Sequence, residues 1–168
     1  PCTIVGGMSA TSVRRSEGIL VGTLSIVVLT VAILQTAVVP ILTVIATQVG
    51  ASAVNVSWVL TANLLAAAAS TPLIGRLADL RSKKRVLLAV LGLVLAGSVL
   101  AAVTSSLALL VLARVLQGAS FSLYPVSVAV LRDEVPAELL VRSMAVLSAM
   151  LGLGGGLGLV VTGLLMKG

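Results

Sequence analysis

A polar face inside an apolar stretch is the first feature of this sequence that could do chemistry. Arg114 lies about seven residues into the apolar run at 107–131. A charge in hydrocarbon costs about 2.5–3.5 kcal/mol on insertion scales, so this arginine should face protein or a water-filled cavity. Helical spacing places polar or small residues on one face with it: Arg114, Gln117, Gly118, Phe121, Ser122 and Pro125. The pattern favours a functional arginine over one that only extends its head to the membrane interface.

Two amides in other apolar stretches are further candidates for a cavity. Asn63 lies off the face of its predicted helix that carries small or polar residues, and we expect it to line a cavity. That face holds Ser57, Thr61, Ala68, Pro72, Gly75 and Asp79. Gln35 lies about one turn before Pro40. A buried glutamine either contacts a substrate or bridges two helices, and the sequence leaves both interpretations open.

Glycines are concentrated in the last apolar stretch. Glycine lowers helix propensity, so such a concentration needs a packing or bending reason. The pairs Gly152/Gly156 and Gly154/Gly158 both have the G-x-x-x-G spacing that lets membrane helices approach closely. We therefore predict helix contacts here, with four packing glycines in the chain: Gly118, Gly154, Gly158 and Gly163.

These residues must be positioned by membrane-spanning helices. The chain has 168 residues, of which 59% are apolar and 10% charged, whereas a soluble domain carries about 25% charged residues. A membrane helix needs about 20 mostly apolar residues. Five segments qualify, at about 18–44, 54–76, 85–104, 107–131 and 136–166. We predict an all-α integral membrane protein with an amino-terminal segment at 1–17 and a five-span domain at 18–168.

The basic residues outside Arg114 predict the orientation of these spans. Nine of them lie before the first span or in the second-to-third and fourth-to-fifth links, and only Lys167 lies on the other side. Because positive charge stays in the cytoplasm, the amino terminus is predicted to be cytoplasmic. Five of the nine belong to "GRLADLRSKKR" at 75–85, so topology, not an anionic ligand, accounts for most of this cluster.

Composition excludes several other functions. Aromatic residues make up 2% of the chain, which is too little for base stacking, so no nucleic acid is expected. The chain has one cysteine, Cys2, and no histidine, which excludes zinc sites of the His/Cys kind. The sequence contains no Walker loop, no paired carboxylates and no nucleophile with a base. We predict neither an enzyme nor a cofactor or metal.

Three motifs together resemble the major facilitator superfamily, in its multidrug:proton antiporter branch. The resemblance covers nearly all of the chain from the first span onward. The stretch 75–85 is similar to the family pattern G-x-L-A-D-R-x-G-R-K, with Leu80 and Ser82 as departures. The matching residues are Gly75, Leu77, Ala78, Asp79, Lys83 and Lys84. By resemblance, Gly75, Asp79, Lys83 and Lys84 form a cytoplasmic gating motif that acts on a helix of the other half.

The fourth and fifth spans carry the other two motifs. Arg114, Gln117 and Gly118 match R-x-x-Q-G, and the resemblance implies a part in proton coupling for Arg114. Span five is similar to G-x-x-x-G-P-x-x-G-G through Gly154, Gly158 and Gly163. Leu159 replaces the proline, Thr162 replaces a glycine, and the first span lacks the acid found in many drug antiporters. Antiport, symport and uniport therefore stay open.

The resemblance implies most of the amino-terminal six-helix half of a major facilitator fold, whose halves enclose the substrate site. The chain begins with Pro1, Met8 is a plausible start, and the last span runs to the end. We therefore expect a fragment that lacks carboxyl-terminal spans of the same protein and cannot transport unaided.

The expected function of the full-length protein is transport of a small molecule by alternating access. The resemblance implies proton-linked efflux of drug-like or metabolite substrates across a bacterial plasma membrane. The expected partners are the lipid bilayer, the substrate, protons and the remaining spans. The expected cavity residues are Arg114, Gln117, Gln35 and Asn63. The alternative is a five-span membrane scaffold or assembly protein without transport activity.

Overall fold

The computed structural model describes residues 17–38, 53–104 and 106–165, and all of the regular structure in these ranges is helical. Five helices are long and apolar enough to cross a membrane, as predicted. The first is Glu17–Val38. It is followed by α2 (Ala53–Leu80), α3 (Lys83–Val103), α4 (Leu107–Gly118), a 3₁₀ segment (Ala119–Ser122), α5 (Leu123–Glu134) and α6 (Ala137–Leu165). The predicted stretches at 1–16 and 39–44, with Pro40, lie outside the described residues.

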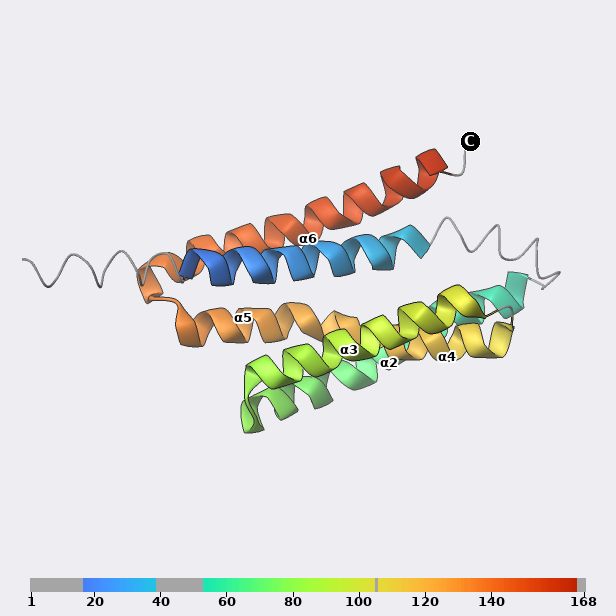
Figure 1. Ribbon diagram of the computed structural model, residues 1–168, viewed down its shortest axis with the longest axis horizontal. Helices are drawn as coiled ribbons and strands as arrows, with labels where there is room; N and C mark the ends of the chain where they lie inside the picture. The colour runs from blue at the N-terminus through green and yellow to red at the C-terminus, as the bar shows by residue number, and fades with distance from the viewer. Residues whose placement is uncertain (1–16, 39–52, 105, 166–168) are drawn as a thin grey trace, which may run out of the picture.

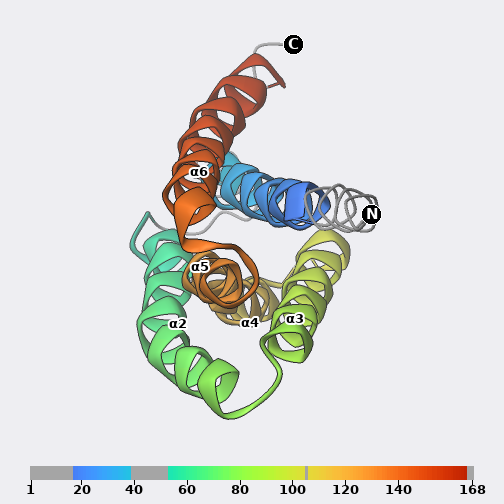
Figure 2. The ribbon, with the colours of Figure 1, turned by 90° about the vertical axis from the view of Figure 1, so that its left-hand side faces the viewer.

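The helices run side by side along the long axis of the molecule (Figure 1). Viewed along that axis, α4 and α5 lie between α2 and α3, while Glu17–Val38 and α6 lie together on the other side (Figure 2). Two larger apolar clusters hold this arrangement, and a third, smaller one surrounds Val59. One joins α2, α3 and the fourth span, through Ala78, Val86, Val90, Val94, Ala119, Leu123 and Val126. The other joins Glu17–Val38, α5 and α6, through Leu24, Val28, Leu131, Val135 and Leu147.

The fourth span is one helical path interrupted by the 3₁₀ segment Ala119–Ser122. Pro125 favours this interruption, because it has no backbone N–H to donate to the carbonyl of Phe121 and its ring crowds that carbonyl. A tighter 3₁₀ turn relieves this conflict. The hydroxyl of Ser122 donates to the carbonyl oxygen of Ala119 at 2.6 Å within the segment.

The second span is longer than its hydropathy predicts. Helix α2 continues to Leu80 and α3 begins at Lys83, so only residues 81 and 82 form the link. The predicted spans at about 54–76 and 85–104 left a longer link, over 77–84, so these two boundaries are wrong. The charged residues interrupt the apolar run, but the helix continues through them. The N–H of Arg81 still donates to the carbonyl of Leu77 at 2.9 Å. Gly75 and Asp79 are thus held on a helix.

The start of α6 agrees with the sequence. The N–H groups of Leu139 and Leu140 both donate to the carbonyl of Pro136 at 3.0 Å. Proline suits this position because its missing N–H has no partner in a first turn. Glu138 lies in that turn, where a negative charge interacts favourably with the helix dipole.

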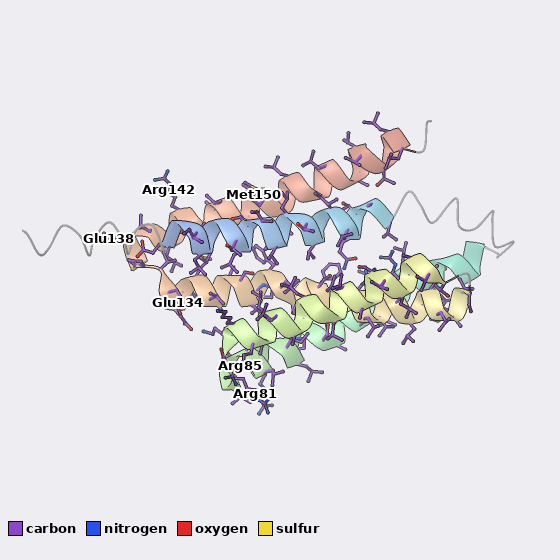
Figure 3. All side chains as sticks on the ribbon, viewed as in Figure 1. Arg81, Arg85, Glu134, Glu138, Arg142 and Met150 are labelled. Atoms are coloured by element: carbon purple, nitrogen blue, oxygen red, sulfur yellow. The ribbon has the colours of Figure 1, made fainter. Side chains whose placement is uncertain are left out.

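Charge is concentrated at one end of the bundle. Arg81, Arg85, Glu134, Glu138 and Arg142 all lie at the end where α2 and α5 finish and α3 and α6 begin (Figure 3). Among the described charged residues, Arg114 is the exception, because it lies seven residues into the fourth span, which starts at Leu107 at the other end of the bundle.

Candidate functional site

A cavity of about 640 Å³ lies between Glu17–Val38, α2, the fourth span and α6. Most of its lining is aliphatic or aromatic, and none of the described lining residues is charged. The polar side chains that reach it are Gln35, Thr36, Asn63, Ser120 and Tyr124. Such a site, apolar with a few polar groups, is typical of small-molecule binding.

Gln35 is the centre of a hydrogen-bonded cluster at the cavity wall. Its Nε2 donates to Ser120 Oγ at 2.7 Å and, more weakly, to the Gln117 carbonyl at 3.5 Å. Its Oε1 accepts from Asn63 Nδ2 at 3.3 Å. The two interpretations of Gln35 are therefore compatible, because the amide both bridges helices and lines the cavity. Asn63 is 6% exposed, and its Oδ1 has no hydrogen-bond partner among the described residues.

Ser120 and Tyr124 are functional candidates that the sequence did not indicate. Ser120, 2% exposed, lies in the 3₁₀ segment, which turns it toward Gln35. The hydroxyl of Tyr124 pairs with Ser148 Oγ at 2.8 Å and so links α5 to α6 beside the cavity. Pro125 was the one available signal, since it predicts a departure from α-helical spacing in the residues before it.

The polar face predicted on the fourth span is not a single lining surface. Phe121 lines the cavity, but Ser122 is fully buried and does not. The prediction assumed regular α-helical spacing throughout, and the 3₁₀ segment breaks that spacing after Gly118.

Arg114 and Gln117 lie outside the described lining of the cavity. Gln117 Nε2 donates to Ser98 Oγ on α3 at 3.1 Å, so its side chain faces that helix. Arg114 is 7% exposed, and its Nε has no hydrogen-bond partner among the described residues. A guanidinium buried in a membrane span without an anionic neighbour is energetically unfavourable. Among the described charged residues, Arg114 therefore has the greatest need for a partner outside the described part of the chain.

Three of the four predicted packing glycines lie at close helix contacts. A Cβ added at Gly118 would lie 2.7 Å from Ala66 Cβ on α2. One added at Gly154 would lie 2.7 Å from the Leu29 carbonyl, and one at Gly158 would overlap Thr36. Gly163 has open space around it among the described atoms, so it does not pack as predicted.

Gly97 also lies at a close helix contact, although it was not among the predicted packing glycines. A Cβ there would lie 2.8 Å from the Ala113 carbonyl on α4. The glycine has no G-x-x-x-G partner on its own helix, so spacing gave no signal.

The predicted gating residues lie together at the charged end. Lys83 Nζ forms an ion pair with Asp133 Oδ2 at 2.5 Å and donates to the Ala129 carbonyl at 3.4 Å, joining α3 to α5. Asp79 and Lys84 border a hollow of about 320 Å³ beside that ion pair. Gly75 lies on α2 with no described atom within 4 Å of an added Cβ.

Comparison with known proteins identifies the family of this bundle. Residues 24–168 match the family described as "Major Facilitator Superfamily". The chain belongs to the Major Facilitator Superfamily. The resemblance stated from the sequence is thereby confirmed at the level of the superfamily, which is a family of membrane transporters and not of enzymes.

Two kinds of curated relative resemble this superfamily chain. A Mycobacterium tuberculosis protein named as an uncharacterized MFS-type transporter is 35% identical over 164 residues, which is 97% of the chain and 23% of the relative. The "Efflux pump dotC" of Dothistroma septosporum is 44% identical over 64 residues, covering 38% of the chain and 11% of the pump. The chain thus spans about a quarter of the length of the mycobacterial relative. These matches favour a transporter over a five-span scaffold.

Proposed function

We propose that the full-length protein containing this chain carries a small, mainly apolar and uncharged molecule across the membrane by alternating access. The 640 Å³ cavity is the single observation that carries the proposal. Its aliphatic and aromatic lining favours an apolar body, and the Gln35 amide supplies a hydrogen-bonding group. The uncharged described lining gives an ionic substrate no counter-charge, and burying an ion without one is costly.

Outward transport is the proposed direction. It is supported by the similarity of part of the chain to a protein named as an efflux pump. The gating motif at the charged end belongs to the cytoplasmic side in this proposal, together with the amino terminus. The membrane is proposed to be a bacterial plasma membrane.

The substrate class is tested with a fluorescent panel. Cells expressing the full-length protein are loaded with neutral, cationic and anionic dyes of similar size, and efflux is followed with and without a protonophore. We expect the neutral dyes to be exported and export to stop when the protonophore collapses the proton gradient. Selective export of the cationic or anionic dyes would contradict the proposed substrate class. Export that continues without a gradient would contradict proton coupling.

Arg114 is proposed to take part in proton coupling from its buried position in α4. Arg114→Ala in the full-length protein should abolish energised transport while leaving expression intact. Arg114→Lys keeps a charge and is expected to retain more transport than Arg114→Ala. Exchange of substrate down its own gradient, which needs no coupling, should persist in both variants. Undiminished energised transport by Arg114→Ala would rule out the assigned role.

A further inference from the structure

Two hollows flank the hairpin formed by α2 and α3 at the charged end, and their charges differ. The first, about 450 Å³, is lined by Leu77, Arg81, Ser82, Arg85, Val86 and Ala89. The second, about 320 Å³, includes Asp79, Asp133 and Glu134 along with basic residues. Arg81 borders both. The first hollow therefore combines two cations with an apolar wall and has no acid among its described lining residues.

The basic residues of the hairpin divide only in part, because Arg81 borders both hollows and Arg85 borders the acid-free one alone. Lys83 is neutralised by Asp133, and Lys84 borders the hollow that contains the three acids. Arg81 and Arg85 are exposed, and neither forms an ion pair with a described residue. Both lie at the end of the α2–α3 hairpin (Figure 3). Topology explains why cations are on this side of the membrane, but it does not explain two free guanidinium groups over an apolar groove.

We propose that this groove binds an anionic phospholipid from the leaflet at the charged end. Guanidinium groups match phosphate oxygens through paired hydrogen bonds, and basic pockets between membrane helices are typical sites for anionic head groups. Leu77 and Ala89 lie one helical turn further into the apolar part of α2 and α3 than Arg81 and Arg85. An acyl chain can run over these two side chains while the phosphate contacts the arginines.

The bilayer is the source of the ligand because the groove opens between two membrane helices at the level where their apolar stretches meet charge. A soluble phosphate needs only the two arginines, whereas a lipid also needs the apolar wall. This difference separates the two sources by experiment. The inference is independent of the transported substrate, because the groove shares no lining residue with the 640 Å³ cavity.

Native mass spectrometry of the full-length protein in detergent tests the site. Phosphatidylglycerol and phosphatidylcholine of equal chain length are titrated, and the bound fractions are compared. Each cation near a membrane surface contributes about a fivefold preference for an anionic lipid. Arg81→Gln/Arg85→Gln should therefore weaken phosphatidylglycerol binding by about 25-fold and phosphatidylcholine binding by less, because phosphatidylcholine has the same phosphate but no net charge. The control is Lys84→Gln, which removes one adjacent charge outside the groove and should cost at most the roughly fivefold expected for a single cation.

Further variants separate lipid from free phosphate. Arg81→Lys/Arg85→Lys keeps the charge and should bind phosphatidylglycerol at an intermediate level. Ala89→Phe fills the apolar wall and should lower lipid binding although both arginines remain; circular dichroism establishes that it is folded. Equal loss from Lys84→Gln and the double glutamine variant would overturn the proposal. So would displacement of the lipid by millimolar inorganic phosphate, or normal lipid binding by a folded Ala89→Phe variant.

Discussion

Gln35 connects three parts of the bundle through one side chain. It contacts Asn63 on α2, the Gln117 carbonyl on α4 and Ser120 in the 3₁₀ segment. Hydrogen bonds between membrane helices contribute about 0.6 kcal/mol on average and at most about 1.7 kcal/mol. The amide therefore matters to the stability of the bundle as well as to the chemistry of the cavity.

Gln35→Leu should lower the free energy of unfolding of the full-length protein by about 1–3 kcal/mol, because all of the Gln35 side-chain hydrogen bonds are lost together. Thermal unfolding in detergent measures the change. Thr30→Ala is the matched control, because Thr30 lies on the same helix, is exposed and bonds only to the Ile26 carbonyl within its own helix. Equal shifts for the two variants would show that the Gln35 contacts contribute nothing.

Residue type alone predicted the candidates that are unusual in a membrane span. Arg114, Gln35 and Asn63 are identified because burying a charge or an amide in hydrocarbon needs a reason. Ser120 and Tyr124 are not, since serine can satisfy its hydroxyl within its own helix and tyrosine is common at membrane interfaces. Their position at the cavity depends on how the fourth span turns, which residue type does not encode.

Glu17–Val38 and α6 are held together by a contact that only glycine permits. Gly154 lies against Leu29 and Ala32 so closely that any side chain must displace one of the helices. On α6, Gly152 and Gly156 have the same spacing but no described neighbour within 4 Å of an added Cβ. One helix therefore carries both a tight glycine face and an open one.

The same substitution should have opposite effects on these two faces. Gly154→Ala should lower the free energy of unfolding by about 1–3 kcal/mol, because overpacking strains the contact. Gly156→Ala should leave it unchanged or raise it by up to about 1 kcal/mol, since alanine is the better helix former. Thermal unfolding of both full-length variants measures the difference. Comparable destabilisation by the two would show that α6 does not pack through the Gly154 face.

The helices themselves were predictable from hydropathy, and their contacts were predictable only in part. Apolar runs long enough to cross a bilayer identify every span, because hydropathy and length suffice for that purpose. Hydropathy placed the end of the second span too early, since it follows charge rather than backbone hydrogen bonds. It also gave no means to choose between the Gly154 and Gly156 faces, which have identical spacing and differ only in what packs against them.

At the scale of the whole molecule, the described charges other than Arg114 define one polar end. The positive-inside rule predicts that this end is cytoplasmic. Ser82 lies in the link at this end, and Ser106 precedes α4 at the opposite end; both are exposed. These two serines allow the orientation to be measured.

In a Cys2→Ser background, S106C should react with a membrane-impermeant maleimide added to intact cells. S82C should react only after the cells are permeabilised. Labelling of S82C in intact cells would contradict the predicted topology and indicate the opposite orientation. Comparable labelling of both variants after permeabilisation is the control for the reactivity of each thiol.

The 3₁₀ segment also has a mechanical consequence for the fourth span. Because Pro125 has no N–H, one backbone hydrogen bond of the fourth span is missing beside the cavity. We therefore expect this span to bend most easily at that point. A load applied at either end concentrates its strain at this point, next to Ser120 and Gln35. The fourth span thus consists of two stiff helical segments with a more flexible turn between them. That turn lies beside the cavity, where a bound molecule would contact it.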